Sequence, residues 1–94
     1  MTFRPGTPDA AREVIREVAA RHRLTIAELV GESRKREIAW PRIEAMARIR
    51  ALTGPDGRPR YTLPRIGQFF GRDHTTVLSA VRRWAEISAS REAA

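Results

Sequence analysis

The chain contains no cysteine, two histidines and a single lysine, Lys35, among its 94 residues. Without cysteine, disulfides and thiolate metal sites are excluded. Two histidines as far apart as His22 and His74 are a poor basis for a metal centre. No hydrophobic run has the length of a signal peptide or a membrane-spanning helix. We therefore expect no metal, no cofactor and no membrane partner, and a cytoplasmic location.

A phosphate-binding loop is also missing. Nucleotide-driven motors need a glycine-rich loop that ends in Lys and then Ser or Thr, and no such stretch surrounds Lys35. Ninety-four residues suffice for one hydrophobic core, so a complete chain of this length is expected to form a single domain without ATPase activity. We expect no enzyme and no small-molecule substrate, because the adjacent polar residues of the run Asp73–Thr75 point in different directions on a helical turn.

Acidic residues are in the minority, and their distribution is uneven. The chain carries 18 Arg and Lys against 11 Asp and Glu, a net charge of +7. Residues 1–30 contribute five arginines and four acids, or +1, whereas residues 31–94 contribute thirteen basic and seven acidic residues, or +6. Concentrated positive charge is typical of nucleic-acid binders. It also suits anionic membranes and RNA, so charge alone does not identify the partner.

Hydrophobic periodicity predicts an all-α fold of about five helices, with a flexible tail over residues 1–8, one domain over 9–88 and a frayed end over 89–94. The expected helices are Asp9–His22, a short one between Thr25 and Gly31, Glu37–Leu52, one capped by Thr62 that ends at Phe70, and one that begins after Asp73. Thr25 and Glu28 have capping-box spacing. Pro41 means that the third helix starts just before it or bends there.

The last two helices have the sequence form of a helix-turn-helix, joined through Gly71 and Arg72. One apolar stripe in the second of them consists of Val77, Ala80, Val81 and Trp84. Asp73 can cap this helix, which places His74, Thr75 and Thr76 on its exposed first turn. Their hydroxyl, methyl and imidazole groups could read base edges in a major groove, although an ordinary capped surface helix is the alternative.

Basic residues flank this first turn. Arg72, Arg82 and Arg83 could meet phosphates if the tip of the helix entered a groove. For Arg82 and Arg83 a solvated polar face is the alternative.

Three motifs in order resemble the C-terminal DNA-binding domain of the bacterial replication initiator DnaA over about residues 12–87. They are Pro41-Arg42 followed by Ala45-Met46-Ala47, Ile66-Gly67 with Phe70, and Arg72–Val77. The resemblance implies major-groove base contacts from Asp73, His74, Thr75 and Thr76. It implies a minor-groove arginine at Arg34, with Lys35 and Arg36 as phosphate contacts in the surrounding basic loop. It also implies a phosphate contact from Arg42 and a backbone contact from Arg50. A narrow A·T minor groove favours an inserted arginine, although Ser33–Arg36 could merely be a solubilising loop.

Two features depart from the family pattern. Only Gly71 precedes Arg72 where the family usually has two glycines, so the turn is one residue shorter. The connection Thr53–Tyr61 is longer, and its Gly and Pro residues predict an exposed loop. Arg58 and Arg60 could add phosphate contacts there, with a disordered basic loop as the alternative.

We therefore expect a sequence-specific double-stranded DNA-binding protein associated with the nucleoid. The departures favour a transcriptional regulator that contacts RNA polymerase or a second regulatory protein. One alternative is a regulator of replication initiation that binds DnaA-type boxes without ATPase activity. Another is a protein-interaction adaptor that has lost DNA binding, against which the intact residues Asp73–Thr76 argue.

Overall fold

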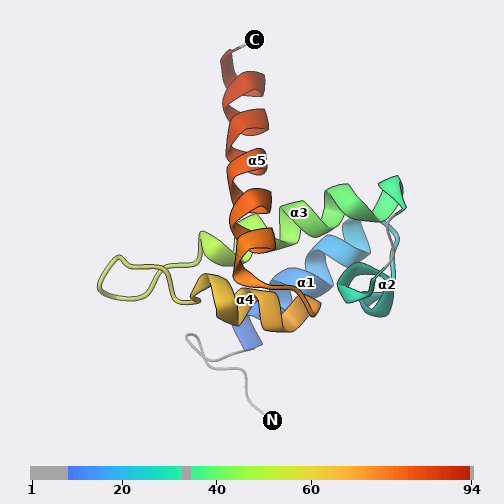
Figure 1. The fold of residues 1–94 in the computed structure, drawn as a ribbon, viewed down its shortest axis with the longest axis horizontal. Coiled ribbons are helices and arrows are strands. Elements are labelled where there is room, and N and C mark those ends of the chain that lie inside the picture. The colour runs from blue at the N-terminus through green and yellow to red at the C-terminus, as the bar shows by residue number, and fades with distance from the viewer. Residues whose placement is uncertain (1–8, 33–34, 94) are drawn as a thin grey trace.

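The computed structural model describes residues 9–32 and 35–93 and shows a bundle of five helices (Figure 1). They are α1 (Asp9–Arg21), α2 (Ile26–Val30), α3 (Arg36–Arg50), α4 (Leu63–Phe70) and α5 (His74–Ala93). Within the described ranges the one extended pairing is an isolated bridge between Thr53 and Pro59. The predicted all-α fold with a C-terminal helix-turn-helix is confirmed. None of the described helices is long and apolar enough to cross a membrane.

Local side-chain caps set the starts of the short helices. Thr25 Oγ1 accepts the amide of Glu28 at 3.0 Å, and Glu28 Oε1 accepts the amide of Thr25 at 2.9 Å, which completes the predicted capping box. The second of these bonds is the main reason that the pKa of Glu28 is lowered. At α4, Thr62 Oγ1 accepts the amide of Arg65 at 3.2 Å. Both caps follow from residues three apart, which is why the sequence alone could predict them.

Helix α3 runs through Pro41 and starts well before it. The helix begins at Arg36, with Lys35 as its cap residue, so the proline lies inside the helix. Proline has no amide hydrogen, and the carbonyl four residues earlier, on Glu37, therefore lacks its helical partner. The helix ends at Arg50 rather than at Leu52, because the Leu52 amide bonds to Ile49 O in a tighter turn.

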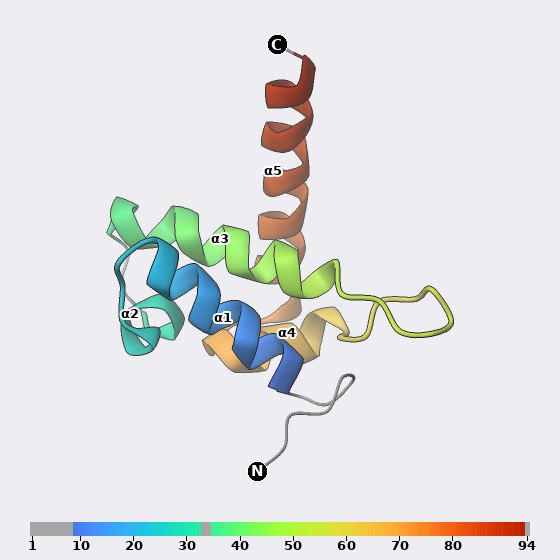
Figure 2. The ribbon, with the colours of Figure 1, turned by 180° about the vertical axis from the view of Figure 1, so that it is seen from behind.

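The hydrophobic core lies where α1, α4 and α5 meet α3 (Figures 1 and 2). Its largest fully buried side chains are Phe70, Leu29, Met46, Ile49, Ile66, Val18 and Val77. Tyr61 joins this core, and its Oη accepts the amide of Ala11 at 3.3 Å. On the far side of α3, Trp40 packs against Trp84 of α5 with ring centroids 5.8 Å apart. Helix α3 is thus packed against both the N-terminal and the C-terminal helix.

Helix α5 continues beyond the packed body. It reaches Ala93 as a helix, so the segment after Ser88, expected to fray, is helical here. Figures 1 and 2 show its C-terminal half standing clear of the other helices. The residues there are mainly Ala, Glu, Ser and Arg, and the good helix formers among them account for the extension.

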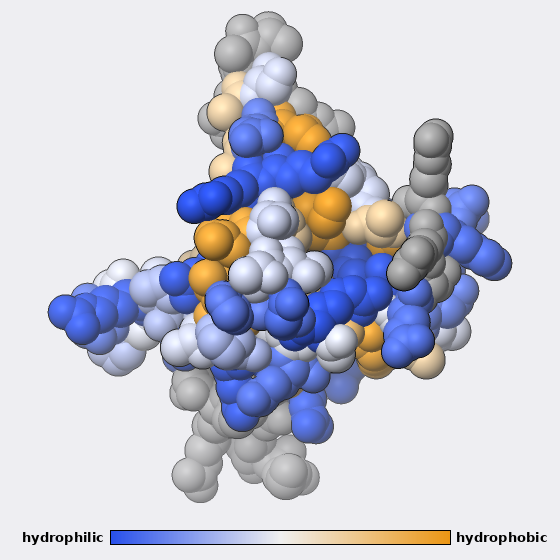
Figure 3. Space-filling view, viewed as in Figure 1, coloured by the Kyte–Doolittle hydropathy of each residue, from blue (hydrophilic) through white to orange (hydrophobic). Residues whose placement is uncertain are grey.

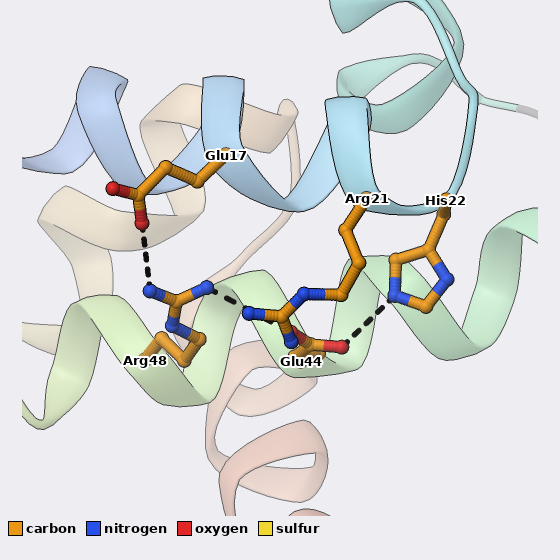
Figure 4. A network of polar contacts seen from close by, with 5 residues as sticks. All are labelled: Glu17, Arg21, His22, Glu44 and Arg48. Carbon is orange, nitrogen blue, oxygen red and sulfur yellow. Dashed lines mark hydrogen bonds and ion pairs between the residues drawn. The ribbon is translucent and has the colours of Figure 1, made fainter.

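A buried carboxylate connects α1 to α3 (Figure 4). Glu44 is only 5% exposed. Its oxygens accept hydrogen bonds from Arg21 Nη1 at 2.8 Å and pair with His22 Nε2 at 3.0 Å. Arg48 Nη1 lies 3.8 Å from the same carboxylate, while its Nη2 bonds to Glu17 at 2.8 Å. A carboxylate this buried needs such partners, because desolvation of an unpaired charge is costly.

Glu44→Ala is expected to lower the free energy of unfolding by about 1–3 kcal/mol, because it leaves Arg48 without its buried neighbour. Urea unfolding followed by circular dichroism measures the effect. The matched control is Glu13→Ala, which removes the exposed ion pair between Glu13 and Arg16 on α1. This change is expected to lower the free energy of unfolding by less than about 0.5 kcal/mol. Equal losses in the two variants would contradict a structural role for Glu44.

Candidate nucleic-acid interface

The first turn of α5 is exposed and held in place by Asp73. Asp73 Oδ1 accepts the amide of Thr76 at 2.9 Å and the hydroxyl of Thr75 at 2.7 Å. His74, Thr75 and Thr76 are all exposed. The cap therefore orders the start of the helix while leaving its polar side chains accessible to a ligand.

The same hydrogen bonds lower the pKa of the Asp73 carboxyl. The bond from the Thr75 hydroxyl, followed by those from Thr76, lowers the pKa of Asp73 from 3.8 to about 2. The carboxylate is therefore ionised at any physiological pH. An ionised carboxylate in a major groove can accept a hydrogen bond from the amino group of cytosine. The cap can thus serve both the helix and a base.

A close backbone contact sets the angle between α4 and α5. Gly67 lies in α4, where a Cβ atom would be 2.2 Å from the carbonyl oxygen of Arg72. Gly71 adopts a left-handed conformation at φ 63°, and the Arg72 amide donates to Gly67 O at 2.9 Å. The single-glycine turn is therefore closed by main-chain contacts. In the sequence, Gly67 is part of the motif Ile66-Gly67. A glycine inside an otherwise apolar helical stripe is the signal there that another main-chain segment approaches the helix closely.

Arg72 joins this turn to the end of α2. Its Nη1 donates to Phe70 O at 2.6 Å, and its Nη2 donates to Gly31 O at 2.9 Å. Gly31 ends α2 and begins the connection to α3 that contains the predicted minor-groove arginine. The guanidinium of Arg72 thus links the turn before α5 to the end of α2, the segments beside the two sets of predicted contact residues. No local pattern predicts this bond, because its partners lie 41 residues apart in the chain.

Arg42, one of the predicted phosphate contacts, is buried in the structure. It is only 7% exposed, and its Nε donates to Leu29 O at 2.8 Å. Burial, and then the nearby charge of Arg72, lower the pKa of Arg42. The guanidinium binds a carbonyl at the end of α2 and so holds this helix, and the phosphate contact of Arg42 stays a prediction.

Arg50 also has a partner within the domain. Its Nη1 donates to the carbonyl of Tyr61 at 2.8 Å, which ties the end of α3 to the start of α4. Arg50 and Arg72 are both half-buried and keep other N–H groups. Their phosphate contacts remain predictions.

The other predicted contact residues differ in what the structure describes. Arg82 and Arg83 are exposed on α5, and neither has a hydrogen bond or ion pair within the described part of the chain. Lys35 is exposed at the cap of α3. Arg34 and the side chain of Arg36 lie outside what the structure describes. Figure 3 shows hydrophilic side chains at the left and right edges of the view and on α5, where hydrophobic side chains lie between them.

The described residues contain no group of three His, Asp or Glu side chains that could hold a metal ion. The candidate site consists of the capped tip of α5 and the neighbouring arginines, whose side chains offer hydrogen bonds and positive charge.

Titration of Asp73 tests the cap. Because its pKa in the folded protein is depressed, the stabilisation from this carboxylate is present above about pH 3.8 and is lost as the pH falls through about 2. A ¹³C shift titration of the carboxyl carbon is expected to give a midpoint near 2. Thr75→Val should raise that midpoint most and Thr76→Val less, since the Thr75 hydroxyl is the largest cause. A midpoint at or above 3.8 in the unsubstituted domain would contradict the cap.

Comparison with known proteins places these elements in a family. The family model described as the bacterial dnaA protein helix-turn-helix matches residues 11–83. The chain is 47% identical over 79 residues to the chromosomal replication initiator protein DnaA of Thermus thermophilus, an overlap covering 83% of this chain and 17% of that protein. It is 46% identical over 74 residues to the DnaA protein of Deinococcus radiodurans, covering 79% and 15%.

For the DnaA protein of Cereibacter sphaeroides the identity is 40% over 79 residues, covering 83% of this chain and 16% of that protein. The chain thus spans less than a fifth of the length of these relatives, all within one part of them. Since the family model covers residues 11–83 of the 94, the chain belongs to the family of bacterial DnaA helix-turn-helix domains.

Proposed function

We propose that this domain binds a defined sequence of double-stranded DNA. The observation that carries the proposal is the capped first turn of α5, which presents His74, Thr75 and Thr76 to solvent in a DnaA-type helix-turn-helix. In this proposal the tip of α5 enters a major groove, where Asp73 and these three side chains contact base edges. Arg34 enters the neighbouring minor groove. The domain would act on chromosomal DNA in the cytoplasm.

The surrounding arginines supply affinity rather than sequence preference. Arg82 and Arg83 are exposed and unpaired among the described residues, so binding a phosphate costs them no internal contact. Lys35, Arg36, Arg50 and Arg72 complete the proposed phosphate contacts. Phosphate contacts fix register and orientation, and they make binding depend on salt.

The proposed target is a DnaA-type box. The relatives are named as chromosomal replication initiators, which favours a role in the control of replication initiation. A dedicated transcriptional regulator, with RNA polymerase or a second regulatory protein as partner, is the second candidate. The single-glycine turn and the longer connection after α3 favour it, since both could shift the preferred sequence.

Selection of bound duplexes from a random library at near-physiological salt distinguishes these roles, since low salt would exaggerate phosphate binding. Enrichment of a box such as TTATCCACA would support replication control. A different defined motif would support transcriptional regulation. Absence of any enriched motif would refute direct readout and support the adaptor alternative.

His74→Ala and Thr75→Ala are each expected to weaken binding to the selected site by about 1–3 kcal/mol and to change binding to random DNA little, because base contacts specify sequence. Arg82→Ala and Arg83→Ala should weaken both and reduce the salt slope by about 1. Titrations at several salt concentrations measure this. The control is Arg12→Ala, since Arg12 is exposed and lies on α1, a helix that does not contact α5. The reverse pattern would contradict the assignment of base readers.

Arg34→Ala is expected to weaken the preference for A·T-rich flanks, because a narrow minor groove has an enhanced negative potential that favours an inserted arginine. Binding to a core site with A·T or G·C flanks measures the preference. An equal loss on both flanks would make Arg34 a phosphate contact instead.

A further inference from the structure

We propose that residues 53–60, here called the hairpin, form a further DNA-contacting element that binds backbone phosphates through Arg58 and Arg60. The hairpin and the loop between α2 and α3 would contact DNA on opposite sides of the same major groove. This inference rests on the proposed function and adds a contact surface to it.

The hairpin is an ordered turn rather than a loose loop. Thr53 pairs with Pro59, the Gly54 amide donates to Arg58 O at 2.9 Å, and the Arg60 amide donates to Leu52 O at 2.9 Å. The disordered alternative considered from the sequence is therefore not what the structure shows. A preformed turn binds with a smaller loss of conformational entropy than a loose one.

The tip of the hairpin has its own stabilising contacts. Asp56 Oδ1 accepts the amide of Arg58 at 3.0 Å, and Gly57 has φ 78°, a backbone conformation that favours glycine. The acidic side chain is thus used to shape the turn. Arg58 and Arg60 against one Asp56 leave this short segment with a net positive charge.

The two arginines of the hairpin have no partner within the domain. Arg58 is exposed and Arg60 half-exposed, and neither guanidinium has a hydrogen bond or ion pair in the described part of the chain. Arg42, Arg50 and Arg72, by contrast, each bind a main-chain carbonyl. Residues 54–60 also contribute nothing to the hydrophobic core, which resumes at Tyr61. The hairpin therefore presents charge without supporting the fold.

The length of α3 sets the separation between the basic loop and the hairpin. The basic loop precedes α3 and the hairpin follows it, and 15 helical residues separate the two by about 22 Å. An extended hairpin of about three residues a side adds about 10 Å. The total approaches the helical repeat of B-DNA, about 34–36 Å. Figures 1 and 2 show α5 crossing α3 between these two ends.

This spacing predicts contacts on both sides of one major groove. In this arrangement the tip of α5 lies in that major groove and the basic loop lies in the minor groove on one side of it. The hairpin then reaches the DNA phosphate backbone near the minor groove on the other side. Two arginines there neutralise phosphates and release counterions, which strengthens binding regardless of sequence. The footprint on DNA should therefore extend further on the hairpin side than the base-reading residues require.

The test compares the Arg58→Ala, Arg60→Ala double variant with the unsubstituted domain on two duplexes that share the selected core site. One duplex carries a full turn of flanking DNA on the hairpin side, and the other is truncated there. On the long duplex the double variant is expected to bind about 5–30-fold more weakly, with a salt slope lower by about 1–2. On the truncated duplex the two proteins should bind alike.

Two controls accompany the double variant. Arg58→Lys with Arg60→Lys should keep most of the binding, because lysine also binds phosphate as a point charge. Arg12→Ala should leave both duplexes unaffected. The melting temperature of the double variant should equal that of the unsubstituted domain, since neither guanidinium has a hydrogen bond or ion pair to the residues that the structure describes.

Failure of this inference and failure of the proposed function give different results. If the unsubstituted domain selects a motif but the double variant binds the long duplex with unchanged affinity and salt slope, the hairpin is not a DNA contact and the proposed function stands. If the unsubstituted domain does not discriminate any duplex, and His74→Ala changes nothing, the proposed function fails and this inference with it.

Discussion

The hydrogen bond from Arg72 to the carbonyl of Gly31 is the contact on which the proposed binding surface depends. It joins the turn before the reading helix to the end of α2, where the basic loop begins, and Arg42 holds the neighbouring carbonyl of Leu29. Two guanidinium groups so close together repel each other, and this contributes to the lowered pKa of Arg42. Carbonyl groups at the C-terminal end of a helix carry partial negative charge and offset that repulsion.

The arginines of this domain therefore divide into two groups with different physical tasks. Those that bind main-chain carbonyls, such as Arg42 and Arg50, fix the positions of helix ends. Others, such as Arg58, Arg82 and Arg83, have no side-chain partner among residues 9–32 and 35–93 and can meet an anionic ligand without losing a contact there. The first group thus sets the geometry of the helix ends, and Arg50 in it keeps further N–H groups.

Local features of the fold could be predicted from the sequence, and long-range ones could not. The caps at Thr25, Thr62 and Asp73 involve residues three apart, so their spacing revealed them. The role of Arg42 depends on a carbonyl 13 residues away, which no local pattern encodes. The order of residues 53–60 depends on main-chain bonds across a turn, and its Gly and Pro content indicated only exposure.

Gly67 has a consequence for how such domains diverge. The space beside it is filled by the main chain of the turn, so this position admits no side chain at all without moving α5. A descendant chain that kept every surface residue from Asp73 to Thr76 but replaced Gly67 would present the same chemical groups at a different angle to α4. Such a lineage would still resemble a DNA-binding protein by its motif after losing the ability to recognise its site. Position 67, which touches no ligand, would then distinguish functional members of the family from relics.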